Sequence, residues 1–379
     1  MSSGSCKYEK LNYLEDEMKV PVFDPKELKV VSEMPPSALF PAIKIFDYPV
    51  TSKEAYRAML QRKPIWQVTL LDSMLFTPAL YPDNIARGQV FEGHPFNPVT
   101  EGGGPDMFGI EWEYVEQVGG SMVRPGEPFI EDANELAEKI VWPDIEKWPW
   151  EEAAARNNET FLASNAYMNA WFVTGWYERL ISLMDFEGAV MAVFDEDQQD
   201  AVKAFFDKLT DLYIKMLEKF FHYMPKIDGV CFHDDWGSQK ETFFSPAVAE
   251  EMIVPYMKRL TDYVHSTGRQ CELHSCGQLL KQVPNIIAAG WDYWNPQLMN
   301  DTHKIYELYG DKLMVGVAPE PFDLENTTEE EQRKRAREYA DKFCDPKKPS
   351  VLNQYSCSLL TPAFREELYI RSRENYSKG

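Results

Sequence analysis

The part of the sequence that decides the fold begins with the apolar run IDGVCFH, residues 227–233. An amphipathic segment with helical spacing follows over residues 245–267, with proline in its first turn as helices prefer. The run QCELH, residues 270–274, has the length and pattern of a second strand, and a second helical segment covers residues 279–289 and ends before a glycine. This alternation predicts parallel strands joined by helical crossovers.

The same alternation extends in both directions along the chain. Further strand-like segments are residues 65–71, 106–114, 167–174, 291–294, 312–317 and 350–355, and helical patterns follow most of them. About eight strands, each followed by a helix, favour an α/β fold of the closed (β/α)8, TIM-type barrel class over an open sheet. We expect residues 1–60 to form an N-terminal extension that packs on the barrel, and residues 61–379 to form the catalytic barrel itself.

Charge and hydropathy restrict the partners. The 379 residues include 39 basic and 61 acidic side chains, which gives a formal net charge of −22. A surface this acidic repels phosphate backbones, so a nucleic-acid partner is not expected. No apolar stretch reaches the length needed to span a bilayer, and the acid-rich first residues do not read as a secretory signal, so we expect a cytoplasmic protein without a membrane partner.

The motif with the most chemical content is Glu272-Leu273-His274-Ser275-Cys276-Gly277. Because side chains alternate along a strand, Glu272, His274 and Cys276 face one side, and the last two lie at the strand's carboxyl end. An imidazole and a thiolate at this spacing can bind one zinc ion, with Cys357, just past the last predicted strand, as the third ligand. Such a set leaves one position free, as catalytic zinc sites do. The alternative is a buried histidine, a core cysteine and an unrelated thiol.

Several motifs occur in an order that resembles a known superfamily. They are FHDDWGSQ (232–239), FSP (244–246), PYMKR (255–259), HSTG (265–268), HSCG (274–277) and AGWD (289–292). Together, over roughly residues 160–365, they resemble the uroporphyrinogen decarboxylase superfamily, and within it the zinc-dependent, corrinoid-linked methyltransferases of O-demethylase and methylcobalamin:coenzyme M systems. The resemblance implies a (β/α)8 barrel, with His274, Cys276 and Cys357 at the positions of the zinc ligands.

One departure argues against decarboxylation. The true decarboxylases of this superfamily carry an arginine-rich segment near the first strand, whereas residues 67–72 here read QVTLLD. A polycarboxylate substrate would meet no cationic clamp there.

The resemblance therefore implies a zinc-dependent methyltransferase that moves a methyl group from a small donor to the cobalt of a corrinoid. A separate partner protein would carry that corrinoid, because the chain has no corrinoid-binding D-x-H-x-x-G loop. A methylcobalamin:thiol methyltransferase, a decarboxylase and a non-catalytic corrinoid-docking subunit remain as alternatives.

Residues 167–171 suggest a donor pocket. On strand spacing Tyr167, Asn169 and Trp171 share one face, and an aromatic wall suits a methoxylated ring. An aryl methyl ether is therefore the preferred donor, with methanol, a methylamine or a thiol acceptor left open. Ordinary core packing of the aromatic residues is the alternative.

Two carboxylates are candidate catalytic residues. Asp234 and Asp235 end one predicted strand, and only one of the two can face the site. We assign Asp234 as the partner of His274 or as a proton acceptor, with a helix cap as the alternative. Glu272 would be either a displaceable fourth zinc ligand or a protonated carboxyl inside the barrel.

Overall fold

A parallel sheet forms the centre of the molecule, which a computed structural model describes over residues 21–36, 42–118 and 120–378. Within these residues the sheet has seven strands, all parallel to their neighbours. Their spatial order is β12 (Val351–Leu352), β11 (Met314–Val317), β10 (Tyr293–Trp294), β9 (Gln270–His274), β8 (Gly229–His233), β7 (Tyr167–Phe172) and β3 (Ser73–Phe76). The middle strands are short and largely apolar because helices cover the sheet, and β8 is buried along its whole length.

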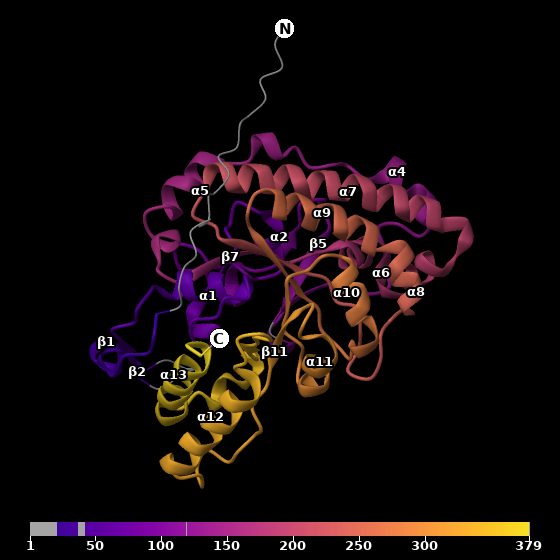
Figure 1. The fold of residues 1–379 in the computed structure, drawn as a ribbon. Coiled ribbons are helices and arrows are strands. Elements are labelled where there is room, and N and C mark those ends of the chain that lie inside the picture. Colours follow the sequence, from indigo (N-terminus) through magenta and orange to yellow (C-terminus); the bar gives the residue numbers. More distant parts are fainter. Residues whose placement is uncertain (1–20, 37–41, 119, 379) are drawn as a thin grey trace.

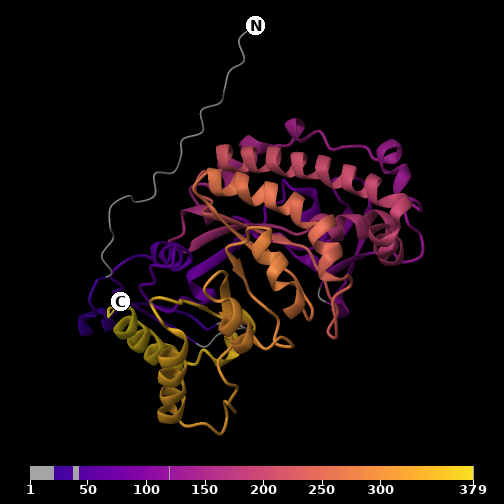
Figure 2. The ribbon, with the colours of Figure 1, turned by 45° about the vertical axis from the view of Figure 1, so that its right-hand side comes forward.

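Helices follow the strands and wrap the sheet, as Figures 1 and 2 show. They are α6 (Trp176–Phe194), α7 (Glu196–Tyr223), α8 (Pro246–Met252), α9 (Val254–Ser266), α10 (Val283–Ala288), α11 (Thr302–Tyr309), α12 (Glu329–Phe343) and α13 (Pro362–Tyr376). The long helix α7 runs beside α9, and α12 packs against α13 at the opposite side of the molecule (Figure 1). The result is an α/β fold with a curled sheet of the TIM-barrel type. Among the helices of the described residues, none combines the length and apolar character that crossing a bilayer requires.

The predicted first strand, residues 65–71, is not a strand in the structure. The Leu352 N–H of β12 donates to the Val68 carbonyl at 3.2 Å, so the segment does lie along the free edge of β12. It then turns at once, because Thr69 caps the 3-10 helix η2 (Leu70–Asp72) and Asp72 accepts the Thr69 N–H in return. The chain therefore passes from the β12 edge to β3 before a ladder can form.

The region between β3 and β7 contains a second sheet and short helices. Its elements are α2 (Pro82–Ala86), α3 (Pro98–Glu101), β4 (Gly104–Pro105), β5 (Glu111–Val115), β6 (Gly120–Val123), α4 (Leu136–Lys139) and α5 (Trp150–Asn157). The strand expected over residues 106–114 corresponds to β5, which pairs antiparallel with β4 and β6 and not with the central sheet.

The N-terminal part contributes a hairpin, β1 (Val30–Met34) with β2 (Ile43–Phe46), and the helix α1 (Ser52–Leu60). Residues 1–20 and 37–41 of the predicted extension lie outside the described residues. Glu27, on the 3-10 helix η1 (Pro25–Leu28), accepts hydrogen bonds from the Arg373 guanidinium at 2.7 and 2.9 Å and from the Tyr369 hydroxyl at 2.6 Å. These bonds join the beginning of the described chain to α13.

Replacing Glu27 with glutamine is expected to destabilise the protein by about 1.5–3 kcal/mol at pH 7, the usual range for hydrogen bonds to charged groups. Burial raises the pKa of Glu27, but the bonds from Arg373 and Tyr369 outweigh it and leave the pKa below its ordinary value of 4.5. A lowered carboxyl pKa contributes stability that is present above 4.5 and is lost as the pH falls through the lowered value. Urea unfolding of both proteins should therefore give curves that differ at pH 7 and converge in acid. A difference that is independent of pH would contradict the assignment.

Candidate metal centre

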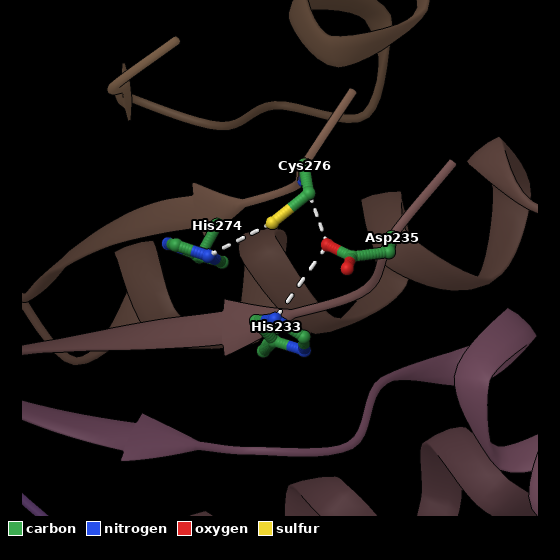
Figure 3. Close-up of side chains that lie close together, drawn as sticks. All are labelled: His233, Asp235, His274 and Cys276. Carbon is green, nitrogen blue, oxygen red and sulfur yellow. Dashed lines mark hydrogen bonds and ion pairs between the residues drawn. The ribbon is translucent and has the colours of Figure 1, made fainter. Parts of the chain in front are cut away.

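Four side chains with metal-binding atoms converge at the carboxyl ends of β8 and β9: His233, Asp235, His274 and Cys276 (Figure 3). One ligand atom from each lies within 4.8 Å of the other three. Cys276 Sγ is 3.6 Å from His274 Nε2, and His233 Nε2 is 3.5 Å from an Asp235 carboxylate oxygen. The carboxyl ends of the strands are where TIM-type folds carry their chemistry.

The register of the two strands places both histidines at the same level. β8 and β9 are parallel neighbours, and His233 pairs directly with His274, with the ring centroids 4.7 Å apart. Beyond the strands, the two loops touch through glycines. A Cβ on Gly277, which has φ of +96°, would lie 2.4 Å from the backbone of Gly237. This backbone contact brings Asp235 against Cys276, whose N–H donates to the carboxylate at 2.7 Å.

The four groups have the chemistry and spacing of a zinc site. With Zn–N and Zn–O distances of about 2.0–2.1 Å and Zn–S of about 2.3 Å, tetrahedral ligand atoms lie about 3.3–3.6 Å apart. The distances of 3.5 and 3.6 Å agree with that spacing. Burial, together with nearby His233, lowers the pKa of His274 to about 3, so its imidazole is neutral and able to coordinate. Burial and the Asp235 carboxylate raise the pKa of the Cys276 thiol, so a cation is needed to hold this group as a thiolate.

Glu178, on α6, orients the His233 ring. His233 Nδ1 donates to Glu178 Oε2 at 2.6 Å, which leaves Nε2 directed at the cluster. Burial opposes protonation of His233, but the charges of Glu178 and Asp235 outweigh it and raise its pKa. Arg87 pairs with the same Glu178 oxygen at 3.3 Å, and its guanidinium lies 4.8 Å from the centroid of the Trp112 ring. A carboxylate behind a ligating histidine is the usual support of a zinc site.

Replacing Glu178 with alanine is expected to weaken zinc binding by about 10- to 100-fold, the range seen when such supporting groups are removed. Glutamine at this position keeps an oxygen that accepts the His233 N–H, so Glu178→Gln should lose less affinity. Competition with a chromophoric chelator measures the zinc affinity of both variants. The matched control is Glu187→Gln, at an exposed position of the same helix. Equal zinc affinity in Glu178→Ala and the control would show that His233 is not a ligand.

Asp234, assigned from the sequence as a catalytic residue, has a fully buried side chain and is not a member of the cluster. It accepts the Glu178 N–H at 2.9 Å, in the first turn of α6, and the Trp236 indole N–H at 3.0 Å. Gly175 permits this contact, since a Cβ there would lie 2.6 Å from Asp234 Cβ. Asp234 therefore caps a helix, and its neighbour Asp235 faces the candidate site.

Cys357, which the sequence suggested as the third ligand, is not a member of the cluster in the described residues. It lies on the 3-10 helix η8 (Gln354–Leu359) and belongs to neither group of metal-binding side chains in the described part of the chain. β12 ends after two residues, and η8 begins at Gln354. His233 and Asp235 are the residues that join His274 and Cys276 in the cluster.

The three residues assigned to the donor pocket lie at different depths. Tyr167 is fully buried, stacks on Tyr56 at 4.8 Å and donates to the Asp228 carbonyl at 3.3 Å, so it belongs to the core below the site. Asn169 is also buried and donates to Glu272 at 2.8 Å. Trp171 lies beside the cluster, with its ring centroid 5.9 Å from that of His233 and 5.6 Å from that of His274. Its indole N–H is buried and has no hydrogen-bond partner among the residues that the structure describes.

Glu272 lies on β9 two residues before His274, on the same face and one pleat deeper. Burial raises the pKa of this carboxyl to about 8, although the hydrogen bond from Asn169 acts in the opposite direction. The side chain is therefore mostly protonated at neutral pH, and it is not a member of the metal-binding group.

A cavity of about 580 Å³ lies beside the cluster at the carboxyl ends of β10, β11 and β12. Its lining includes His303, Glu320 and Tyr355. Tyr355 connects the two regions: its pKa is raised by burial first and then by the nearby Cys276 and Asp235 charges. The cavity offers space for a small organic molecule next to the candidate metal centre.

Sequence reasoning missed three residues of the centre: His233, Asp235 and Glu178. The first two carry a usable signal, because His233-Asp234-Asp235 ends a strand adjacent to the one that ends at His274. Neighbouring parallel strands present their carboxyl ends together, so both ends belong to one site. Glu178 has no such signal, since its contact with His233 depends on how α6 packs.

The comparisons with known proteins agree with this fold. Residues 172–362 match the sequence profile of the family described as uroporphyrinogen decarboxylase (URO-D). Among solved structures, a methyltransferase from Methanosarcina mazei is similar with a TM-score of 0.55 and 15% sequence identity, over 86% of this chain and 98% of that one. No curated protein matches the sequence.

Proposed function

The chain belongs to the uroporphyrinogen decarboxylase family, and from that premise we propose that it is a zinc-dependent methyltransferase acting with a separate corrinoid protein. It would move a methyl group from a small donor to the corrinoid cobalt. The observation that carries the proposal is the convergence of His233, Asp235, His274 and Cys276 beyond β8 and β9.

The region of residues 67–72 argues against the decarboxylase alternative. Gln67 is buried, and its side-chain amide donates to the Ser350 carbonyl at 2.8 Å. Asp72 is buried as well and accepts from Thr69, Ser52 and Trp66. Both side chains are committed to the packing of the sheet edge, and neither supplies the positive charge that a polycarboxylate substrate needs.

The four side chains of the cluster would hold the zinc ion. When bound, zinc would act as a Lewis acid that stabilises negative charge on the donor heteroatom as the methyl group leaves. In the transfer, the bond between that heteroatom and the methyl carbon breaks and the heteroatom keeps the bonding pair. The methyl group would be accepted by the reduced corrinoid of the partner protein, which would supply the electron pair for the new bond.

The supporting residues have separate roles in this proposal. Glu178 fixes the tautomer of His233 through Nδ1, and Asp235 holds the Cys276 backbone. Glu272 retains a proton at neutral pH, and because its Oε2 accepts the Asn169 amide, Oε1 is left to carry that proton. It would protonate the oxygen of the demethylated product.

The preferred donor is an aryl methyl ether, with methanol, a methylamine or a thiol acceptor as the other candidates. Trp171 supports this preference, since it presents an aromatic face and an unpaired indole N–H beside the two histidines. An aromatic donor would stack against the ring, and the N–H would donate to a ring substituent.

Replacing Trp171 with alanine is expected to raise KM for an aryl methyl ether by up to roughly tenfold, the value of one aromatic contact. Trp171→Phe keeps an aromatic ring, so its KM for the aryl methyl ether should lie between those of the unmodified protein and Trp171→Ala. Steady-state kinetics with methanol is the control, because methanol makes no stacking contact. An equal rise of KM for methanol and for the aryl ether would remove Trp171 from the donor pocket.

Three further features belong to the proposal. The central sheet would be a complete (β/α)8 barrel, supported by the bond between Leu352 and Val68 that attaches the segment before β3 to the β12 edge. Residues 1–60 would form an extension that packs on the barrel formed by residues 61–379. The corrinoid protein would act with this chain in the cytoplasm and approach the mouth formed by the strand ends.

The test is a donor screen with purified protein and reduced corrinoid protein. Methoxylated aromatics, methanol, methylamines and thiols are supplied in turn, and the cobalt absorbance is followed. Methylation of cobalt that requires both a donor and zinc supports the proposal, and demethylation of methylcobalamin by a thiol would identify the thiol alternative. Decarboxylation that survives a strong chelator, or no transfer with any donor, would contradict it.

A further inference from the structure

A second group of metal-binding side chains lies at the other end of β9. It consists of His265 in the last turn of α9, Cys271 near the start of β9, and Asp292 just before β10. The mechanism proposed above uses none of them. Cys271 and His274 are three residues apart on the same strand and face opposite sides, so the two groups are separated by about 10 Å along the strand.

The three ligand atoms have nearly the spacing of a tetrahedral zinc site. Cys271 Sγ lies 3.5 Å from His265 Nε2 and 3.4 Å from Asp292 Oδ2, and the last two atoms are 2.8 Å apart. Zinc bond lengths of about 2.0–2.3 Å place ligand atoms about 3.3–3.6 Å apart. Two of the three distances agree, and the third requires the exposed imidazole to move by roughly half an ångström, which a surface side chain does readily.

Charge and access favour a divalent cation. A thiolate and a carboxylate beside a neutral imidazole would balance Zn²⁺. Burial and the Asp292 carboxylate raise the pKa of Cys271, so without a cation its thiol donates to Asp292. Cys271 is buried, whereas the side chains of His265 and Asp292 are 37% and 27% exposed, so the group is open to solvent on that side.

We propose that His265, Cys271 and Asp292 form a second zinc site, which ties the end of α9 to the starts of β9 and β10. The competing explanation is a hydrogen-bond network alone, since Asp292 Oδ2 also accepts the Cys271 N–H at 2.8 Å. The two explanations differ in metal content and in the presence of a thiolate–metal bond.

The test uses full-length protein in which the first centre is disabled by His274→Ala and Cys276→Ala. Cobalt(II) added to this metal-free double variant should give about one tight equivalent and a thiolate-to-cobalt charge-transfer band. Adding His265→Ala or Cys271→Ser should abolish the band and weaken zinc binding by at least about 100-fold, since each removes one of three ligands. Cys271→Ser keeps a hydroxyl able to donate to Asp292, so the fold is retained.

Matched controls are His222→Ala, at an exposed position near the end of α7, and Cys357→Ala on η8, neither of which belongs to a metal-binding group. Both should leave the band unchanged. Absence of a thiolate band in a double variant with native circular dichroism, or a band that survives both His265→Ala and Cys271→Ser, would overturn the proposal. Because methyl transfer is not the readout, failure of the first centre and failure of this second site give different results.

Discussion

Replacing Cys276 with alanine is expected to remove the zinc of the first centre and to lower the rate of methyl transfer by more than about 100-fold. Replacing a residue that only hydrogen-bonds to a metal ligand already lowers affinity or activity by about 10- to 100-fold. The thiol is the only sulfur in the group that contains His233, Asp235 and His274. Losing it removes a ligand and leaves the Asp235 carboxylate without the cation that would balance it. Metal analysis of the purified variant and transfer to reduced corrinoid protein measure the two effects.

Cys357→Ala is the matched control for this prediction. It removes a thiol that is partly exposed like Cys276, from the mouth of the same fold. Zinc content and transfer should both stay at the unmodified level. Loss of zinc in Cys357→Ala with retention in Cys276→Ala would reverse the assignment and restore the ligand set expected from the sequence.

Replacing Arg179 with methionine is expected to destabilise the protein by about 3–5 kcal/mol, because removing one partner of a buried ion pair leaves unpaired charge in the interior. Arg179 is fully buried on α6 and pairs with Asp83 and with Asp106, the latter at 2.6 Å. Tyr81 donates to Asp83 and Trp112 to Asp106, so these carboxylates also anchor α2 and β5. Chemical unfolding at neutral pH measures the effect.

Two comparisons separate this ion network from general packing. Arg337→Met on α12 removes an exposed arginine that pairs with exposed Glu330 and with partly exposed Glu367, and should cost less than about 1 kcal/mol. The triple variant Asp83→Asn, Asp106→Asn and Arg179→Met removes both unpaired carboxylates and should be more stable than Arg179→Met alone. If the triple variant is less stable than Arg179→Met alone, unpaired buried charge is not the cause of the destabilisation in Arg179→Met. Since Glu178 precedes Arg179, the single variant should also weaken zinc binding.

The sequence predicted the α/β class with a parallel sheet, and it placed His274 and Cys276 together, because these signals are local. Strand alternation put His274 and Cys276 on one face, and strand–helix alternation put them at the carboxyl end of β9. It did not predict the turn at Thr69, where a hydrogen bond between Thr69 and Asp72 ends the first strand before it pairs. Short apolar runs predict strands whether or not a partner lies beside them.

The other site assignments depend on how segments that are far apart in sequence pack together. Alternation shows that Asp234 and Asp235 face opposite ways, but only the packing of α6 shows that Asp234 caps that helix. Similarly, Cys357 is near the last strand in sequence, but it lies on η8 and is not a member of the cluster. Tyr167 and Trp171 share a face of β7, but they lie at different depths along the strand. Tyr167 is therefore a core residue, whereas Trp171 lies beside the site.

A crystal structure of the zinc-loaded protein, with anomalous difference maps recorded on both sides of the zinc edge, shows whether a metal ion binds between the ends of β8 and β9. We expect a zinc peak within bonding distance of Cys276 Sγ and of the Nε2 atoms of His233 and His274. A zinc-loaded crystal with no peak there, or with the ion bound by Cys357 and without His233, would contradict it.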